Sequence, residues 1–392
     1  MKKIATAFCF LLIFNAFAQN LNHGKVKADY YAEIPFKWIK GKIIIPVEIN
    51  NKTYSFLLDT GAPNIISKKI AKSIQAKHLK SIVVKDATGK KDSMNIVEIP
   101  LLKLGEISFE NTASLQQDST NNLIFDCLEI DGLIGSNMLR NSIIQFDLKR
   151  KLIILTDSKK KVNLSKKNAS KLQLIGNQKL PIFWMKFKQD RKVKLALEFD
   201  SGSSNFIDIC NRNYHELKKQ HVFKNTNVKT ANGSNTISLF GLGDKKELFQ
   251  FTIPKGKINN FTFKNALVSS NGGSLSKIGT KLLQYGVVTI DFIHKKFYFN
   301  PSKKEVDLHE KTFGFNFTVK DNQLIIGTVW NANLKPKIAY GNKVLSINGI
   351  DYTNKDICEL MLGKSILEQE NKLQITFINK DNKKTTLFIE KQ

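Results

Sequence analysis

The chain has 392 residues, of which 42% are hydrophobic and 10% aromatic. This length predicts two or three compact units, and the apolar content excludes a largely disordered chain. The formal net charge of +27 favours anionic partners, but a Lys-rich composition with a solvated surface explains it as simply. Because no basic stripe is interleaved with aromatic residues, we predict no nucleic-acid partner.

The first residues predict an export signal. Lys2 and Lys3 precede an apolar run from Ile4 to Phe14, and Ala16-Phe17-Ala18 supplies an A-x-A cleavage pattern. We expect residues 1–18 to be a signal peptide and the mature protein to be periplasmic or extracellular; a buried N-terminal helix is the alternative. No later apolar run approaches the roughly 20 residues of a membrane span, so no transmembrane segment is expected after cleavage.

Cysteine and histidine spacing gives no sign of a metal site. Loss of the signal leaves Cys127, Cys210 and Cys358, which permits one disulfide of undetermined pairing and leaves a thiol over. The chain has no C-x-x-C and no H-E-x-x-H. We predict neither a metal nor another cofactor.

Four short blocks recur in the same order at closely similar offsets, which predicts an internal duplication. The matching pairs are Asp59–Ile66 with Asp200–Ile207, Val84–Gly89 with Val228–Gly233, Ile99–Asn111 with Ile253–Asn265, and Ile134–Leu155 with Ile278–Phe299. The repeats predict a first unit at 28–157 and a second at 172–303. The stretch 158–171 between them is rich in Lys, Ser and Asn and is predicted to be a linker.

Each repeat is predicted to consist mostly of strands. Runs rich in β-branched and aromatic residues, such as Lys42–Ile49, Tyr54–Leu58 and Lys194–Phe199, are typical of strands. Short helices are expected at Lys68–Gln75 and at Asn213–Gln220.

Residues 311–392 are predicted to form a separate unit of five short strands and one helix, Asn354–Leu362. The stretch Gly341–Gly349, together with Phe313-Gly314-Phe315, resembles a PDZ domain of the permuted bacterial order. The resemblance implies that Phe313, Gly314 and Phe315 form the loop that holds the carboxylate of a C-terminal peptide ligand. A small accessory domain that binds no peptide is the alternative.

Each repeat also carries an Asp-Thr/Ser-Gly turn after an apolar strand, Asp59-Thr60-Gly61 and Asp200-Ser201-Gly202. A hydrophobic-hydrophobic-Gly segment follows in the first repeat, Leu133-Ile134-Gly135, and its counterpart in the second is Lys277-Ile278-Gly279. Either turn alone is ordinary turn chemistry. Two such turns within one repeated unit resemble the aspartic peptidases, and specifically the retropepsin-like group, over about residues 28 to 301. Lys277 departs from the family pattern because it occupies an apolar position.

The resemblance implies a mainly β fold, in which two pseudo-twofold-related β lobes precede the small α+β PDZ-like unit. It also implies that Asp59 and Asp200 form one catalytic pair that shares a proton and activates water. Thr60 and Ser201 would lock the two turns together through their hydroxyls, while Gly61 and Gly202 would let the turns approach closely. A Ser203 hydroxyl bonded to Asp200 would favour the charged form of Asp200, so Asp59 is expected to carry the shared proton more often.

A polar hairpin tip is predicted about 25–30 residues after each Asp, where the resemblance implies a flap over the substrate. The tips are Ala87, Thr88 and Gly89 in the first repeat and Ala231, Asn232 and Gly233 in the second. For the second copy, an ordinary surface hairpin is an equal alternative.

The predicted function is an exported aspartic endopeptidase that acts on extended polypeptides. Because both half-sites lie in one chain, a monomer is expected. A non-catalytic peptide-binding protein whose pair is spoiled by Lys277 is one alternative, and a surface adhesin that holds anionic glycan is another. A propeptide between Gln19 and Glu33 is left open.

Overall fold

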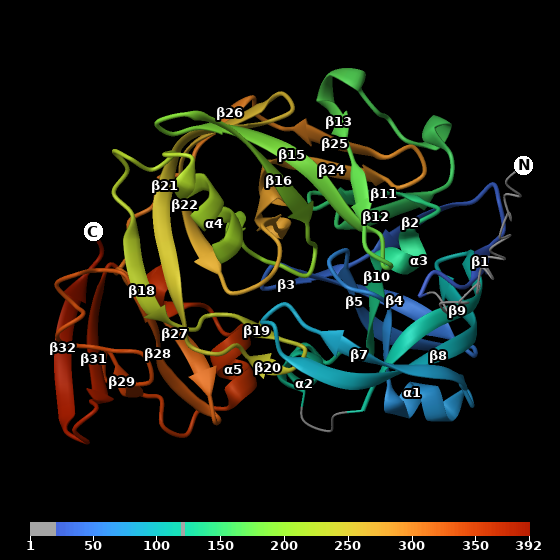
Figure 1. Cartoon of the computed structure of the whole chain (residues 1–392). Helices are drawn as coiled ribbons and strands as arrows, with labels where there is room; N and C mark the ends of the chain where they lie inside the picture. The colour runs from blue at the N-terminus through green and yellow to red at the C-terminus, as the bar shows by residue number, and fades with distance from the viewer. Residues whose placement is uncertain (1–20, 119–121) are drawn as a thin grey trace, which may run out of the picture.

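The computed structural model describes residues 21–118 and 122–392. The expected signal peptide, residues 1–18, lies outside the described residues. The fold is mainly β: the described strands form two nine-stranded sheets, two six-stranded sheets and one two-stranded sheet (Figure 1).

The first nine-stranded sheet is built from the first repeat and has the order β1-β9-β6-β10-β5-β4-β8-β7, with β3 paired to β4. Its strands are β1 (Lys25–Val26), β3 (Lys37–Ile39), β4 (Lys42–Ile49), β5 (Lys52–Asp59), β6 (Ile65–Ser67), β7 (Lys77–Lys85), β8 (Lys91–Leu104), β9 (Ile107–Gln117) and β10 (Gly132–Gly135). β10 runs parallel to β5 and antiparallel to β6, and β6 runs parallel to β9. The register of β10 on β5 sets Gly135 opposite Asp59.

The second nine-stranded sheet has the order β14-β15-β16-β23-β17-β22-β21-β18, with β26 paired to β22. Its strands are β14 (Gln173–Ile175), β15 (Leu180–Lys188), β16 (Lys192–Phe199), β17 (Ile207–Cys210), β18 (Lys229–Gly233), β21 (Lys246–Ile258), β22 (Phe261–Asn271), β23 (Lys277–Ile278) and β26 (Glu305–Asp307). β23 runs parallel to β16 and antiparallel to β17, and β17 runs parallel to β22. The pairings around the first Asp turn therefore recur around the second. β26 continues this sheet beyond residue 303, the expected end of the unit.

Both repeats contribute to one six-stranded sheet, of order β13-β25-β24-β11-β12-β2. Its strands are β2 (Tyr31–Pro35), β11 (Ile143–Asp147), β12 (Leu152–Thr156), β13 (Ala169–Lys171), β24 (Gly286–Asp291) and β25 (Lys296–Pro301). β11 pairs antiparallel with β24 and so joins the two repeats. β13 lies within the stretch 158–171 that was expected to be only a linker, but pairing with β25 makes it part of the sheet.

One large hydrophobic core runs through both repeats, beside a smaller cluster within the first repeat. The ring of Phe146 from the first repeat lies 5.4 Å from that of Phe199 in the second, and Phe183 stacks on Phe297 at 3.9 Å. Since the core is continuous, the border between the repeats is not a break in packing.

The helices are short and lie between strands. Beside the sheets are α1 (Lys68–Ser73), α2 (Leu123–Leu128), α3 (Ser136–Leu139) and α4 (Asn211–Lys219), with 3₁₀ turns η1 (Lys159–Lys161), η2 (Lys166–Asn168) and η3 (Thr280–Tyr285). The Ser67 hydroxyl caps α1 by accepting from the Ile70 N–H at 3.3 Å. α1 and α4 match the two helices expected from sequence, within two residues at each end.

The C-terminal segment forms its own six-stranded sheet over a separate hydrophobic core. It contains β27 (Phe315–Lys320), β28 (Gln323–Val329), β29 (Lys343–Ile347), β30 (Ile350–Asp351), α5 (Ile357–Leu362), α6 (Ile366–Gln369), β31 (Lys372–Ile378) and β32 (Lys384–Glu390). The sequence predicted five strands and one helix, so one strand and one helix were missed. The Asp356 side chain accepts from the N–H groups of Cys358 and Glu359. This cap starts α5 after residue 354, the predicted helix start.

This C-terminal unit packs against both repeats (red in Figure 1). A disulfide between Cys127 and Cys358 joins α2 to α5, which settles the pairing that the sequence left open, and Cys210 is a buried free thiol. On the other side, Trp330 packs with Ala231 and Leu248 of the second repeat. Across the described residues, no helix has both the length and the apolar character that a membrane crossing requires.

Candidate active site

The two Asp turns occupy equivalent places in the two nine-stranded sheets. Asp59 is the last residue of β5, and Asp200 directly follows β16. Each aspartate closes a tight turn with its own carbonyl, which accepts from the N–H of Ala62 at 3.3 Å or of Ser203 at 3.1 Å. The Asp200 side chain is buried and that of Asp59 is partly buried.

Reciprocal hydroxyl bonds join the two turns. Thr60 Oγ1 donates to the carbonyl of Phe199 at 2.6 Å, and Ser201 Oγ donates to the carbonyl of Leu58 at 2.7 Å. Each hydroxyl also accepts from the other turn, since the Thr60 N–H lies 2.9 Å from Ser201 Oγ and the Ser201 N–H lies 3.1 Å from Thr60 Oγ1. Thr60 and Ser201 are fully buried. The two hydroxyls thus link the two turns through four hydrogen bonds.

The glycines bring each turn against the carboxylate of the other. A Cβ on Gly61 would lie 2.8 Å from Asp200 Oδ1, and one on Gly202 would collide with the Asp59 carboxylate. Each glycine N–H also donates to its own aspartate, from Gly61 to Asp59 Oδ1 and from Gly202 to Asp200 Oδ1, both at 2.9 Å. Only glycine leaves room for the two carboxylates to be neighbours at this crossing.

The two carboxylates have unequal proton affinities. Burial, reinforced by the charge of Asp200, raises the pKa of Asp59 to about 7. Burial alone would raise the pKa of Asp200 too, but the charge and hydrogen bond of Lys277, with help from Lys42, lower it below its ordinary value. Of the two carboxyl groups, Asp59 therefore binds a proton more strongly than Asp200.

The cause of this asymmetry differs from the expected one. Ser203 donates its backbone N–H, at 3.1 Å, to Asp200 Oδ1, and not the hydroxyl that the sequence suggested. Lys277 instead places Nζ 2.7 Å from Asp200 Oδ2. The side chain of Lys277 is only 18% exposed. Opposing charges at this distance in a buried site strongly favour the ionised carboxylate.

Three further charged residues of the site were not singled out from sequence. Lys42, at the start of β4, donates to the carbonyl of Gly202, and nothing in its sequence context marks it. Glu198 is only 4% exposed, and burial together with the charge of Asp200 raises its pKa well above the ordinary value. Glu198 lies on β16, two residues before Asp200, which directly follows that strand, so strand alternation could have identified it. Asp208 accepts from Asn205 Nδ2 at 3.0 Å on both oxygens.

The first predicted flap is a hairpin tip between β7 and β8. Asp86 Oδ1 accepts from the N–H and hydroxyl of Thr88 and from the N–H of Lys90, which shapes the tip that includes Ala87 and Gly89. This tip contacts the second repeat through Lys246, whose Nζ lies 3.0 Å from the carbonyl of Thr88. The same Nζ lies 3.1 Å from the Gly272 carbonyl.

The second predicted flap is not a hairpin tip, and this prediction was wrong. Ala231, Asn232 and Gly233 lie inside β18, which pairs with β21 over Lys229–Gly233. The turn-forming residue types suggested a tip. Pairing with β21 on one side and packing against the C-terminal unit on the other override that preference. The C-terminal unit closes on this strand, where a Cβ on Gly233 would collide with the Gly327 carbonyl.

The predicted carboxylate loop of the C-terminal unit is a tight turn ahead of β27. Gly314 has φ +72°, and its carbonyl accepts from the N–H groups of Trp330 and Asn331 at 2.7 and 2.9 Å. The side chains of Phe313 and Phe315 are buried. A ligand could therefore meet only the backbone of this loop and not the two phenylalanine rings.

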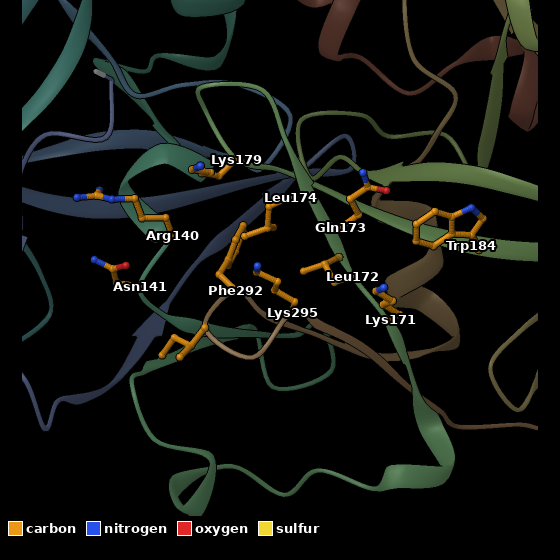
Figure 2. A pocket seen from close by; sticks show the side chains of 11 residues that line it. Arg140, Asn141, Lys171, Leu172, Gln173, Leu174, Lys179, Trp184, Phe292 and Lys295 are labelled. Atoms are coloured by element: carbon orange, nitrogen blue, oxygen red, sulfur yellow. The ribbon is translucent and has the colours of Figure 1, made fainter. Parts of the chain in front are cut away.

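A basic hollow of about 800 Å³ contains none of the predicted site residues (Figure 2). Its wall includes Arg140, Lys171, Lys179, Lys295, Trp184 and Phe292. Arg140 is engaged in structural bonds, because its guanidinium donates to the carbonyls of Asn137 and Gly24. Among residues 21–118 and 122–392, no cluster of three or more His, Cys, Asp or Glu side chains is arranged to hold a metal.

Comparison with known proteins points to one class. Residues 45–138 match the family model described as aspartyl protease, a range that contains the first Asp turn and Leu133–Gly135. This match supports a protease hydrolase. Among solved structures, the chain is distantly similar to the aspartic proteinase from Irpex lacteus, with a TM-score of 0.41 and 11% identity over 69% of this chain and 97% of that one. No curated protein matches the chain.

Proposed function

We propose that this chain is an exported aspartic endopeptidase that hydrolyses extended polypeptides with Asp59 and Asp200 as its catalytic pair. The observation that carries the proposal is the reciprocal bonding of Thr60 and Ser201, which links two equivalent Asp turns. Two unrelated turns would not need such a link. Here it keeps the two carboxylates at a fixed separation, as a catalytic pair requires. The aspartyl protease match over residues 45–138 supports the same activity.

We assign the proton transfers from the unequal proton affinities of Asp59 and Asp200. The ionised Asp200 takes a proton from water as the water oxygen bonds to the peptide carbonyl carbon, while Asp59 gives its proton to the carbonyl oxygen. When the resulting diol collapses, the proton on Asp200 passes to the amide nitrogen, the C–N bond breaks, and Asp59 regains a proton from the diol hydroxyl. Since the pKa of Asp59 is about 7, the singly protonated pair is lost as pH rises through that value.

The test is proteolysis of a denatured protein mixture across pH by the wild type and by Asp59→Asn and Asp200→Asn. Because each change removes a proton-transfer group, we expect cleavage to fall by about 10²–10⁴-fold. Asp321→Asn, in an exposed turn, is the matched control and should cleave like the wild type. Equal cleavage by all four proteins would end the proposal.

One observation favours a second candidate, a peptide-binding protein without catalysis. Lys277 Nζ donates to Asp200 Oδ2 at 2.7 Å, so this oxygen already has a bonded partner where catalysis would need it to accept a proton from water. In that case the wild type would protect or retain extended peptides without cleaving them, and its peptide affinity would survive both Asn substitutions.

The remaining assignments are proposals as well. We propose that residues 1–18 direct export, that the chain acts as a monomer, and that the C-terminal unit is PDZ-like and binds a peptide carboxylate. The Cys127–Cys358 disulfide supports an oxidising compartment. Cellular fractionation, light scattering and titration with C-terminal peptides test these three points separately.

A further inference from the structure

Resting on the proposed function, we propose that Lys277 is a positioning residue that keeps Asp200 ionised, fixing Asp200 as the base that takes the proton from water and Asp59 as the acid. The proposal starts from geometry. Lys277 Nζ lies 2.7 Å from Asp200 Oδ2, while Asp200 Oδ1 is already held by the N–H groups of Gly202 and Ser203. Both oxygens of Asp200 therefore accept bonds, and one of them faces a full positive charge.

The backbone holds Lys277 in this place. Lys277 lies on β23, where it pairs with Glu198 of β16 and with Asp208 of β17. β23 thus lies between β16, which carries Glu198, and β17, which carries Asp208. The family pattern has an apolar residue at the position of Lys277. Such a residue would leave Asp200 Oδ2 without an ionic partner.

The other charged groups around Lys277 leave Asp200 as its ionic partner. The site comprises the acids Asp59, Asp200, Glu198 and Asp208 and the lysines Lys42 and Lys277. Glu198 is buried, and its Oε1 has no hydrogen-bond partner among the described residues, which suits the uncharged acid. Burial also raises the pKa of Asp208. Both of its carboxylate oxygens accept from Asn205 Nδ2. Lys42 is directed to the carbonyl of Gly202.

An ion pair of this kind divides the two roles between the carboxylates. In a symmetric pair the shared proton can sit on either aspartate, and the two have no separate identities. A cation bonded to one member removes that freedom, because protonating Asp200 would cancel its charge attraction to Lys277. The charge of Lys277 also acts on Asp59, but only at longer range and as a smaller contribution than burial and Asp200.

The experiment compares pH–rate profiles of the full chain for the wild type, Lys277→Met and Lys277→Arg. Loss of the cation should move the acid limb of kcat/KM upward by about 1–3 pH units. The alkaline limb should move less, in the same direction, because Asp59 is farther from the ammonium. Lys277→Arg should keep the acid limb within about half a pH unit of the wild type. Lys264→Met, which removes an exposed lysine paired with Glu305, controls for the change in net charge.

Glu198→Gln is the second test and retains the Lys277 side chain. If Glu198 is uncharged, this variant should leave the acid limb within about half a pH unit of the wild type. A shift as large as that of Lys277→Met would overturn the charge assignment. An unmoved acid limb in Lys277→Met, or a higher kcat at its optimum, would overturn the role of Lys277.

NMR of the side-chain carboxyl carbons, in protein labelled with ¹³C at aspartate Cγ, separates this proposal from the proposed function. The signal that disappears in Asp200→Asn should titrate below the ordinary aspartate range in the wild type and 1–3 units higher in Lys277→Met. That readout needs no turnover. An inactive protein with the predicted titration would refute the peptidase function alone, whereas an active one with an unmoved Asp200 signal would refute the role of Lys277.

Discussion

At the scale of single residues, the site combines one carboxyl that resists ionisation with one that resists protonation. Burial and the charge of Asp200 raise the pKa of Asp59 to about 7, while Lys277 lowers that of Asp200. The same differences act on stability, because any group whose pKa differs between the folded and unfolded states makes folding depend on pH.

The first prediction concerns Asp59 and stability. Its folded pKa lies above its unfolded value, so its ionisation lowers the free energy of unfolding as pH rises from about 4 to about 7. Asp59→Asn removes this loss and should gain stability over the wild type across that range, by up to roughly 4 kcal/mol. Urea unfolding at pH 4.5 and pH 8 measures the difference. A constant difference between the two proteins at both pH values would contradict it.

The second prediction concerns the hydroxyls that join the turns. Ser201→Ala removes a donor to Leu58 and leaves the buried N–H of Thr60 without its acceptor, so it should cost about 1–3 kcal/mol per orphaned group. Ser203→Ala is the matched control, since Ser203 meets Asp200 through its backbone, and it should cost less than about 0.5 kcal/mol. Denaturant unfolding compares them; equal costs would show that the hydroxyl link is not what stabilises the crossing.

At the scale of elements, the first hairpin tip is held by a bridge to the second repeat. Asp86 organises the tip internally and accepts from the N–H of Phe240 at 3.1 Å, and Lys246 binds the carbonyl of Thr88. These two contacts hold the tip against the second repeat. If the tip acts as a flap, they would have to break for it to open. The strand β18, which was expected to be a second tip, is instead held between β21 and the C-terminal unit.

The third prediction follows from this bridge. Lys246→Met removes the ammonium that joins Thr88 to Gly272, so amide exchange at residues 87–90 should accelerate by about tenfold, with a loss of global stability below about 1.5 kcal/mol. Hydrogen-exchange mass spectrometry measures both. The neighbouring Lys245→Met, whose ammonium lies over the Tyr340 ring, should leave the tip unchanged; faster exchange in both variants would point to lost net charge and not to the bridge.

At the scale of the whole molecule, the C-terminal unit is tied to both repeats at separate points. Its α5 is bonded to α2 through Cys127 and Cys358, and its β28 meets β18, where the Ser234 N–H lies 3.3 Å from the Gly327 carbonyl. A hollow of about 750 Å³ remains at this junction, lined by residues of all three parts, including Lys90, Leu242 and Val319. The hollow lies beside the tip of the first hairpin, because Lys90 in its lining donates its N–H to Asp86 of that tip.

The fourth prediction tests this attachment. The disulfide closes a loop across 231 positions, for which the chain-entropy model gives a stabilisation of roughly 5 kcal/mol. Cys127→Ser with Cys358→Ser should lower the unfolding midpoint and expose the segment between β26 and β27 to limited proteolysis, while the separate core of the C-terminal unit keeps that unit folded. Cys210→Ala, which removes a buried thiol outside the bridge, should not produce that cleavage. Identical digestion patterns for the three proteins would refute a role for the disulfide in docking.

Much of this protein was determined by local sequence. Both Asp turns, the strands that precede them and the helices α1 and α4 follow from residue types and spacing, because turn chemistry and strand preference act within a few residues. The repeated order of the blocks predicted an internal duplication but no strand pairings, and the same pairings are found around both Asp turns. A hydroxyl link between Thr60 and Ser201 was expected only through the family resemblance, and the structure places reciprocal hydrogen bonds between these two residues and the opposite turns.

What only the tertiary structure decided involves groups far apart in sequence. The Cys127–Cys358 pairing, the placement of β13 and β18 within sheets, and the bridge from Lys246 to Thr88 all depend on long-range packing. The effect of Lys277 on Asp200 also depends on tertiary structure. The sequence showed a lysine in an apolar position of the family pattern, but it did not show whether this lysine would disrupt the carboxylate pair or stabilise its ionised member. Whether a lysine spoils a carboxylate pair or orders it depends on where its ammonium lies, and burial beside Asp200 sets that position.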